Sequence, residues 1–281
     1  MDLIHQENPC TYKIMRNIVY FSNQGIPFEL IKAAAMSEEA EENAQRDGEV
    51  DEDSDLKSSK SKDEDDLLEA ATRLKEFSFL RFRNVRNDVQ SYEMHKLVQE
   101  ATRYSLCKDK NEGLQFPKRA LEIILQVFPI SNHNTWDRRE NFLPHALAVS
   151  AWPEVSKEKL SVSQLLGKVS MYLFHQGRSR EKEAVDLKHL KLRQKMLGEG
   201  HPDTIMTMTH LAMTYYQQGR SMEAEQIYLD VLELRKEMLG ERHPDTIWSM
   251  ADLAATNHQQ GRSAEAEQIF LDVLELRKKS A

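Results

Sequence analysis

A 42-residue repeat in the C-terminal half constrains the fold of this chain more than any other feature. The string His-Pro-Asp-Thr-Ile at 201–205 returns at 243–247, and Gln-Gln-Gly-Arg at 217–220 returns at 259–262. Residues 201–237 and 243–279 are identical at 27 of 37 aligned positions. A fainter copy lies upstream, so there are three units, at about 159–200, 201–242 and 243–281. Such periods are typical of repeat architectures whose units stack on their neighbours.

Each unit is predicted to contain two α-helices. The first begins at His-Pro-Asp-Thr. Proline suits the first helical position, because the N–H that it lacks would have no hydrogen-bond partner there. It should end at Gly219 or Gly261, where a left-handed C-cap favours glycine. Ser221 or Ser263 is then predicted to cap the second helix. That helix carries one apolar stripe at helical spacing, formed in unit two by Ala224, Ile227, Tyr228, Val231 and Leu232.

A single helical pair cannot bury such a stripe, whereas about three stacked pairs can. We therefore expect a mainly α fold that ends in an α-solenoid, with the first helices lining a concave groove. A groove of this kind suits a protein or peptide ligand. The candidate ligand residues are Met206, Thr209, Met213 and Tyr216 in unit two and Trp248, Ala251, Ala255 and His258 in unit three. Packing between helices is the alternative role for the methionine and tryptophan positions.

The repeat strings also carry a family resemblance. Gln-Gly-Arg, Glu-Ala-Glu, Val-Leu-Glu-Leu-Arg-Lys, Leu-Gly and His-Pro-Asp-Thr resemble the tetratricopeptide repeats of kinesin light chains, and more closely the variant found in fungal NB-ARC proteins. In kinesin light chains, asparagines near the middle of the first helix contact bound peptides. The matching positions here are His210 and Asp252. This departure argues against the kinesin type of cargo recognition.

The two outer units depart from unit two. In unit one, Lys182 and Asp186 stand where unit two has Ala224 and Tyr228, which predicts either an end unit or a neighbour that satisfies the polar groups. In unit three, the stripe is expected to be partly exposed, and it contains Ile269, Phe270, Val273 and Leu274. Exposed apolar faces of this size usually bind a partner. We therefore expect self-association through the last repeat.

The N-terminal half begins with a helix, turn and helix over residues 11–34, with the breaker Gly25-Ile26-Pro27 between the helices. Residues 37–66 follow, with 14 acidic against 4 basic residues. A segment so charged and poor in apolar residues is predicted to be disordered, because it cannot bury enough apolar surface to order itself. A phosphorylated or basic-partner-binding tail is its alternative role, with Ser61 as a candidate phosphosite.

Order is expected to resume at Asp66 with a helix, a strand at 78–83, a hairpin partner at 89–92 and a helix that opens at His95. This is the layout of a winged-helix unit. The predicted domains are therefore a winged-helix-like domain at 1–110 that contains the acidic insert 37–66, a helical bridge at 111–155, and the repeats at 156–281.

This N-terminal layout resembles the winged-helix region that follows the nucleotide-binding core in fungal NB-ARC proteins of the NOD-like, STAND class. Its strongest match is the stretch 92–99, in which Met94, His95 and Lys96 correspond to the Met-His-Asp motif. In that family the histidine touches the phosphates of bound ADP. The chain has no G-x-x-x-x-G-K-[ST] string. The resemblance thus implies a nucleotide-binding core before Met1, and His95 is predicted to be vestigial as a phosphate contact.

No residue pattern indicates a catalytic, cofactor or metal site. The ten histidines and two cysteines lack metal-ligand spacing, and two cysteines give no disulfide framework. There is no secretory signal and no apolar run near the ~20 residues of a membrane helix. These features predict a soluble, cytoplasmic, non-enzymatic chain.

The function expected from the sequence is a protein-interaction scaffold or sensor tail of NB-ARC signalling, of the kind used in self/non-self recognition. A kinesin-light-chain-like cargo adaptor is one alternative, but it would need an N-terminal heptad coiled coil, which is lacking. A winged-helix DNA-binding regulator is another, suggested by Arg81, Arg83 and Arg86. The net charge of −8 makes nucleic acid a poor default partner.

Overall fold

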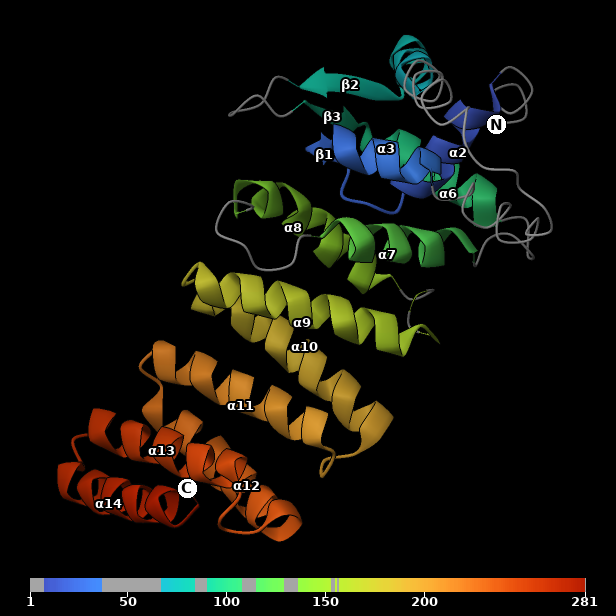
Figure 1. Cartoon of the computed structure of the whole chain (residues 1–281). Helices are drawn as coiled ribbons and strands as arrows, with labels where there is room; N and C mark the ends of the chain where they lie inside the picture. The colour runs from blue at the N-terminus through green and yellow to red at the C-terminus, as the bar shows by residue number, and fades with distance from the viewer. Residues whose placement is uncertain are drawn as a thin grey trace, which may run out of the picture. The chain divides into compact units, whose positions relative to one another are not determined.

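The computed structural model describes residues 8–36, 67–83, 90–107, 115–128, 136–152, 155 and 157–280. The predictions for the acidic insert 37–66, for Ser61 and for Arg86 lie outside these residues. The chain divides into two compact units, Met1–Leu165 and Leu166–Ala281. Helix predominates in the described residues, accompanied by one small sheet (Figure 1). The mainly α fold class is therefore confirmed.

Before residue 159, the described part of the N-terminal unit contains five helices and a further helical segment at 67–76. The five are α2 (Pro9–Ile18), α3 (Phe28–Met36), α6 (Lys96–Cys107), α7 (Gln115–Val127) and α8 (Trp136–Ala151). Helix α2 begins where the Asn8 side chain accepts a hydrogen bond from the Thr11 N–H (2.9 Å), with Pro9 in the first turn. Helix α7 packs against α2, α3 and α8, and the buried side chains of this unit include both aliphatic residues and phenylalanines, among them Phe116 and Phe142.

A three-stranded antiparallel sheet completes this unit, with strand order β1-β3-β2. The strands are β1 (Ile26–Pro27), β2 (Leu80–Arg83) and β3 (Ser91–Met94), and the register pairs Leu80 with Met94. The predicted hairpin is thus present, about two residues later than expected. The stretch 25–27 was predicted only as a turn; Gly25 does turn, at φ +64°, but Ile26 and Pro27 add an edge strand to β3. The winged-helix assignment of these elements stays a prediction.

Three side chains fasten the connection between α2 and β1. Gln99 Nε2 donates to the Phe21 carbonyl oxygen (2.8 Å), and Trp152 Nε1 donates to that of Tyr20 (2.9 Å). His145 Nε2 donates to the Gly25 carbonyl oxygen (3.1 Å). Because His145 is fully buried, desolvation lowers its pKa to about 4, although the bond to Gly25 opposes this shift. The imidazole is therefore neutral at pH 7.

The C-terminal unit is a succession of helical hairpins, which confirms the predicted α-solenoid. Helix α9 (Lys159–His175) spans the division between the units and is followed by α10 (Ser179–Leu197). Unit two contains α11 (Pro202–Gln217) and α12 (Ser221–Leu239), and unit three contains α13 (Pro244–Gln259) and α14 (Ser263–Ser280). From α10 onward each helix packs against the next (Figure 1). The predicted stripe of unit two lies inside, with Ala224, Tyr228 and Val231 buried.

The helix ends follow the repeat strings with one correction. Proline occupies the first turn of α11 and α13, and the rings of His201 and His243 accept the N–H two residues later (3.1 and 3.2 Å). Gly219 adopts φ +75°, as a left-handed C-cap requires. The prediction that Ser221 caps the second helix was wrong. Arg220 occupies the N-cap, and the Ser221 hydroxyl instead donates to Gln259 Oε1 (2.6 Å), a contact with the next repeat.

Candidate functional site

The candidate ligand surface consists of the eight predicted residues on α11 and α13. Met206 and Trp248 stand 42 residues apart at the same repeat position, and their side chains are 49% and 58% exposed. The preceding residues, Ile205 and Ile247, are buried and face the core. The helical period therefore separates a packing side from an exposed side at the start of each first helix.

The other six residues of this surface are less exposed, apart from His258. Thr209, Met213, Tyr216, Ala251 and Ala255 are half-buried. The Thr209 hydroxyl donates to the Ile205 carbonyl oxygen one turn earlier (3.0 Å), so it is occupied within its own helix. Tyr216 packs against the core around Tyr228. In the described structure, the large apolar side chains that remain available on this surface are mainly Met206 and Trp248.

One contact to this surface comes from a residue that the sequence argument missed. The Arg277 guanidinium of α14 lies 4.8 Å from the centre of the Trp248 ring, within cation–π range. This contact limits the orientations open to the indole. No local sequence signal marks Arg277, because its partner lies on the other helix of the hairpin.

The middle of each first helix carries a titratable group, at the positions matched to the asparagines. Burial lowers the pKa of His210, and the nearby Lys182 ammonium adds to the shift. Burial raises the pKa of the Asp252 carboxyl, and Arg235 opposes this shift. Within the described ranges, no side chain forms a hydrogen bond or ion pair with the Asp252 carboxylate. This acceptor is therefore open to a ligand donor.

A buried ion pair on α10 lies where the first repeat packs against the second. Lys182 Nζ is 2.5 Å from Asp186 Oδ2, and both side chains are almost fully buried. Lys182 also donates to Thr214 Oγ1 (2.6 Å) and to the His210 carbonyl oxygen (3.1 Å), both on α11. Asp186 accepts from Ser170 Oγ (2.5 Å) and Thr214 Oγ1 (2.7 Å). Of the two alternatives from the sequence, the structure thus shows the second, in which neighbours satisfy the polar groups.

The Gln-Gly-Arg turns join each hairpin to the one before it. Gln218 Nε2 donates to the Ser179 carbonyl oxygen (2.9 Å) and to Glu183 (3.0 Å), and Arg220 Nη1 donates to Glu183 (2.8 Å). The next turn repeats the pattern on Glu225, through Gln260 (2.9 Å) and Arg262 (2.5 Å). The recurring Glu was a signal for this ladder in the sequence, but it was used there only as part of the family resemblance.

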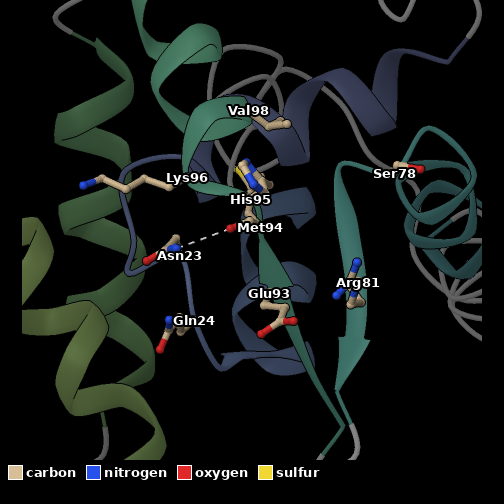
Figure 2. Close-up of a pocket in the computed structure, with 9 residues that line it drawn as sticks. All are labelled: Asn23, Gln24, Ser78, Arg81, Glu93, Met94, His95, Lys96 and Val98. Atoms are coloured by element: carbon tan, nitrogen blue, oxygen red, sulfur yellow. Dashed lines mark hydrogen bonds between the residues drawn. The ribbon is translucent and has the colours of Figure 1, made fainter.

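A pocket of about 560 Å³ in the N-terminal unit holds the Met-His motif (Figure 2). The Met94 N–H donates to the Asn23 carbonyl oxygen (2.8 Å), which ties β3 to the segment before β1. His95 Nδ1 accepts from the Leu97 N–H (3.2 Å) at the start of α6, so the ring has a structural contact of its own. Figure 2 shows Lys96 and Arg81 on opposite sides of Met94, with Glu93 nearer Arg81. The vestigial phosphate role of His95 stays a prediction.

The sequence interpretation missed several residues of this pocket. Its lining also includes Asn23, Gln24, Ser78 and Val98. In the described part of the chain, no three His, Cys, Asp or Glu side chains gather closely enough to hold a metal ion. None of the helices there combines the length and apolar character needed to cross a bilayer.

Comparison with known proteins identifies the repeats. Residues 161–237 and 207–279 match the tetratricopeptide repeat family, so the C-terminal part of the chain carries tetratricopeptide repeats. Over 124 residues, 43% of this chain, the sequence is 37% identical to a nucleotide-binding leucine-rich repeat (NLR)-like protein of Hyaloscypha variabilis. The matched stretch spans only 12% of the length of that relative.

Two solved structures show low similarity to the fold. The kinesin light chain TPR-like repeats of Podosopora anserina share 17% identity at a TM-score of 0.39, over 65% of this chain and 93% of that one. BtubC (BKLC) from P. vanneervenii shares 16% identity at a TM-score of 0.49, over 89% of this chain and 90% of that one. The repeat assignment depends on the family match and on the helical hairpins described above.

Proposed function

We propose that this chain, with tetratricopeptide repeats over residues 161–279, is a protein-interaction module whose first repeat helices bind a peptide or protein ligand. Proteins built from such repeats are typically non-enzymatic scaffolds. The observation that carries the proposal is the exposure of Met206 and Trp248 at equivalent positions of adjacent units. Large apolar side chains exposed at a repeating position are costly in water and become favourable when a partner covers them.

The chemistry around these two residues supports an extended peptide ligand. Tryptophan is over-represented among the residues that dominate binding energy at interfaces, and Arg277 restrains the indole. The Asp252 carboxylate and the exposed His258 supply polar contacts on the same helix. An apolar anchor beside a few polar groups is the usual composition of a specific peptide site.

The wider role that we propose is a sensor or scaffold tail of NB-ARC type. The relative from Hyaloscypha variabilis, described as an NLR-like protein, supports this role. In this view the N-terminal elements form the winged-helix unit at 1–110, the segment 111–155 is a bridge, and ligand capture by residues 156–281 is relayed through them. The replacement of the kinesin-light-chain asparagines by His210 and Asp252 disfavours the cargo-adaptor alternative.

Peptide selection with the full chain tests the ligand surface. A random peptide library displayed on phage would be selected on the unmodified protein, and the dissociation constant of the best peptide measured for Met206→Ala and Trp248→Ala. We expect each variant to weaken binding by roughly tenfold or more, because truncating a central anchor costs about 2 kcal/mol. Circular dichroism would verify that both variants keep their helix content.

Met222→Ala is the matched control. Met222 is 80% exposed but lies at the start of α12, a second helix of the repeat. Its truncation should leave the affinity unchanged. Equal affinities for the Met206, Trp248 and Met222 variants would place the ligand elsewhere and refute the proposed surface.

A further inference from the structure

Helix α14 exposes an apolar face that the equivalent helix of unit two covers only in part, since Leu229 of α12, the equivalent of Leu271, is itself 43% exposed. Tyr228 of α12 is 3% exposed, whereas Phe270, at the same repeat position of α14, is 40% exposed. Leu271 and Leu274 are also about half exposed, at 50% and 53%. Val273, in contrast, is buried, and α14 packs against α13. Phe270, Leu271 and Leu274 therefore form an exposed apolar stripe on α14 that a further helix could cover.

The packing of α12 indicates what kind of element covers such a stripe. In unit two the cover is α13, which follows α12 in the hairpin succession and packs against it. The connection past the end of α13 also brings the cation of Arg262 onto Glu225 of α12. The element that covers α12 thus supplies apolar side chains, which pack on the apolar stripe of α12, and a positive charge, which pairs with Glu225.

Glu267 of α14 is the repeat equivalent of Glu225, but its surroundings differ. Its side chain is exposed, and in the described chain it makes no hydrogen bond or ion pair. Lys278 lies near the C-terminal end of the same helix. Its side chain is likewise exposed and makes no hydrogen bond or ion pair among the described residues. The face of α14 therefore has an open acid near its N-terminal end and an open base near its C-terminal end.

These charges and the apolar residues fall on one line of the helix. Glu267, Leu271, Leu274 and Lys278 follow one another at intervals of four, three and four residues, the spacing of neighbours on one helix face. The pattern is complementary to itself when reversed. An antiparallel copy centred between Asp272 and Val273 would set Glu267 opposite Lys278 and Leu271 opposite Leu274.

We propose that α14 is a self-association surface on which a second copy of this chain docks its own α14 in antiparallel orientation. The contact would bury Phe270, Leu271 and Leu274 of both copies and form two symmetric Glu267–Lys278 ion pairs. Such an isologous interface closes as a dimer, because the same patch serves both copies. It is separate from the candidate ligand surface, which lies on the first helices, so the two proposals can fail independently.

Sedimentation equilibrium of the full chain, from about 1 to 100 µM, tests the proposal through a charge exchange. Glu267→Lys and Lys278→Glu should each raise the dimer dissociation constant by about tenfold or more, because each creates like-charge contacts across the interface. An equimolar mixture of the two variants should form a heterodimer at least as readily as the unmodified chain forms its dimer. The double variant, with both charges exchanged, should dimerise again.

Two further variants complete the design. Glu199→Lys makes the same charge change in the exposed connection between α10 and α11 and should leave the dimer unaffected. Leu274→Asp should abolish dimerisation without loss of helix content, since this side chain is already half exposed. The proposal is overturned if the unmodified chain stays monomeric at 100 µM, if the mixture gains nothing over the single variants, or if Glu199→Lys weakens the dimer equally.

Discussion

Replacing Lys182 by alanine is the substitution that most directly tests the physical account of the repeat interface. The change removes the cation from a buried pair and leaves the Asp186 carboxylate with only the hydroxyls of Ser170 and Thr214. Removing one partner of a buried ion pair costs about 3–5 kcal/mol, because the remaining charge has neither water nor a counter-ion. That is a large part of the ~5–15 kcal/mol that stabilises a typical domain.

The repeat itself provides the compensating change. Unit two has Ala224 and Tyr228 at the two equivalent positions, and both are buried against α13. The double variant Lys182→Ala/Asp186→Tyr therefore has about the same side-chain volume as the original pair, with no buried charge. Since exchanging a buried pair for apolar residues of similar volume is often neutral or stabilising by ~1–4 kcal/mol, the double variant should regain the stability lost by the single one.

Urea unfolding at pH 7, followed by circular dichroism, would measure the unmodified chain, both single variants and the double variant. The resulting cycle gives the coupling energy of the pair, and hydrogen exchange in α10 and α11 would localise the loss. A cost below ~1 kcal/mol for Lys182→Ala would match an exposed pair and refute the argument from burial. A double variant as unstable as Lys182→Ala would refute the argument from volume.

Three further outcomes are expected. Burial lowers the pKa of His145 to about 4, below the value of ~6.5 in an unfolded chain. As the pH falls, the unfolded state therefore binds the proton first. Up to ~3 kcal/mol of stability is lost between pH 6.5 and 4 as a result. His145→Gln should flatten that part of the stability curve, measured as urea midpoints at pH 7 and 4.5. Gly219→Ala should lower the stability measured by thermal unfolding by ~1–2 kcal/mol, because φ is +75° there. Gly200→Ala should be nearly neutral, because an added Cβ at that position would meet no atom within 4 Å. Gln218→Ala should destabilise the chain by ~1 kcal/mol through the lost inter-repeat hydrogen bonds. Gln217→Ala should not, because the Gln217 side chain is exposed. Equal losses of stability would contradict the role given to the contacts of the Gln-Gly-Arg turns.

The N-terminal unit shows why its sheet was only partly predictable. The strands β2 and β3 lie close in sequence, so alternation and a nearby partner revealed their pairing within about two residues. Strand β1 pairs with a segment about 65 residues later and is two residues long. So short a strand has no pattern of its own, and Gly25 and Pro27 gave only a turn signal.

The candidate ligand surface was similarly predictable only in part. The repeat spacing placed all eight residues on the first helices, because a period of 42 residues aligns equivalent positions. It did not distinguish Met206 and Trp248, which are exposed, from Met213 and Tyr216, which are half-buried. That distinction depends on which neighbouring helix covers each position, and the contact of Arg277 with Trp248 depends on the angle between α13 and α14.

The sequence by itself determined that helical hairpins form and about where their helices begin and end, since proline, glycine and apolar spacing act within a few residues along the chain. Only the tertiary structure decided how polar residues at the interfaces are satisfied. In the sequence, Lys182 indicated either an end unit or a neighbour that satisfies it, and Ser221 indicated a helix cap. In the structure, Lys182 completes a buried network with α11, and Ser221 bonds to the next repeat. Hydrogen bonds and burial act through space, so a residue's partners depend on elements that its own neighbourhood in the sequence does not specify.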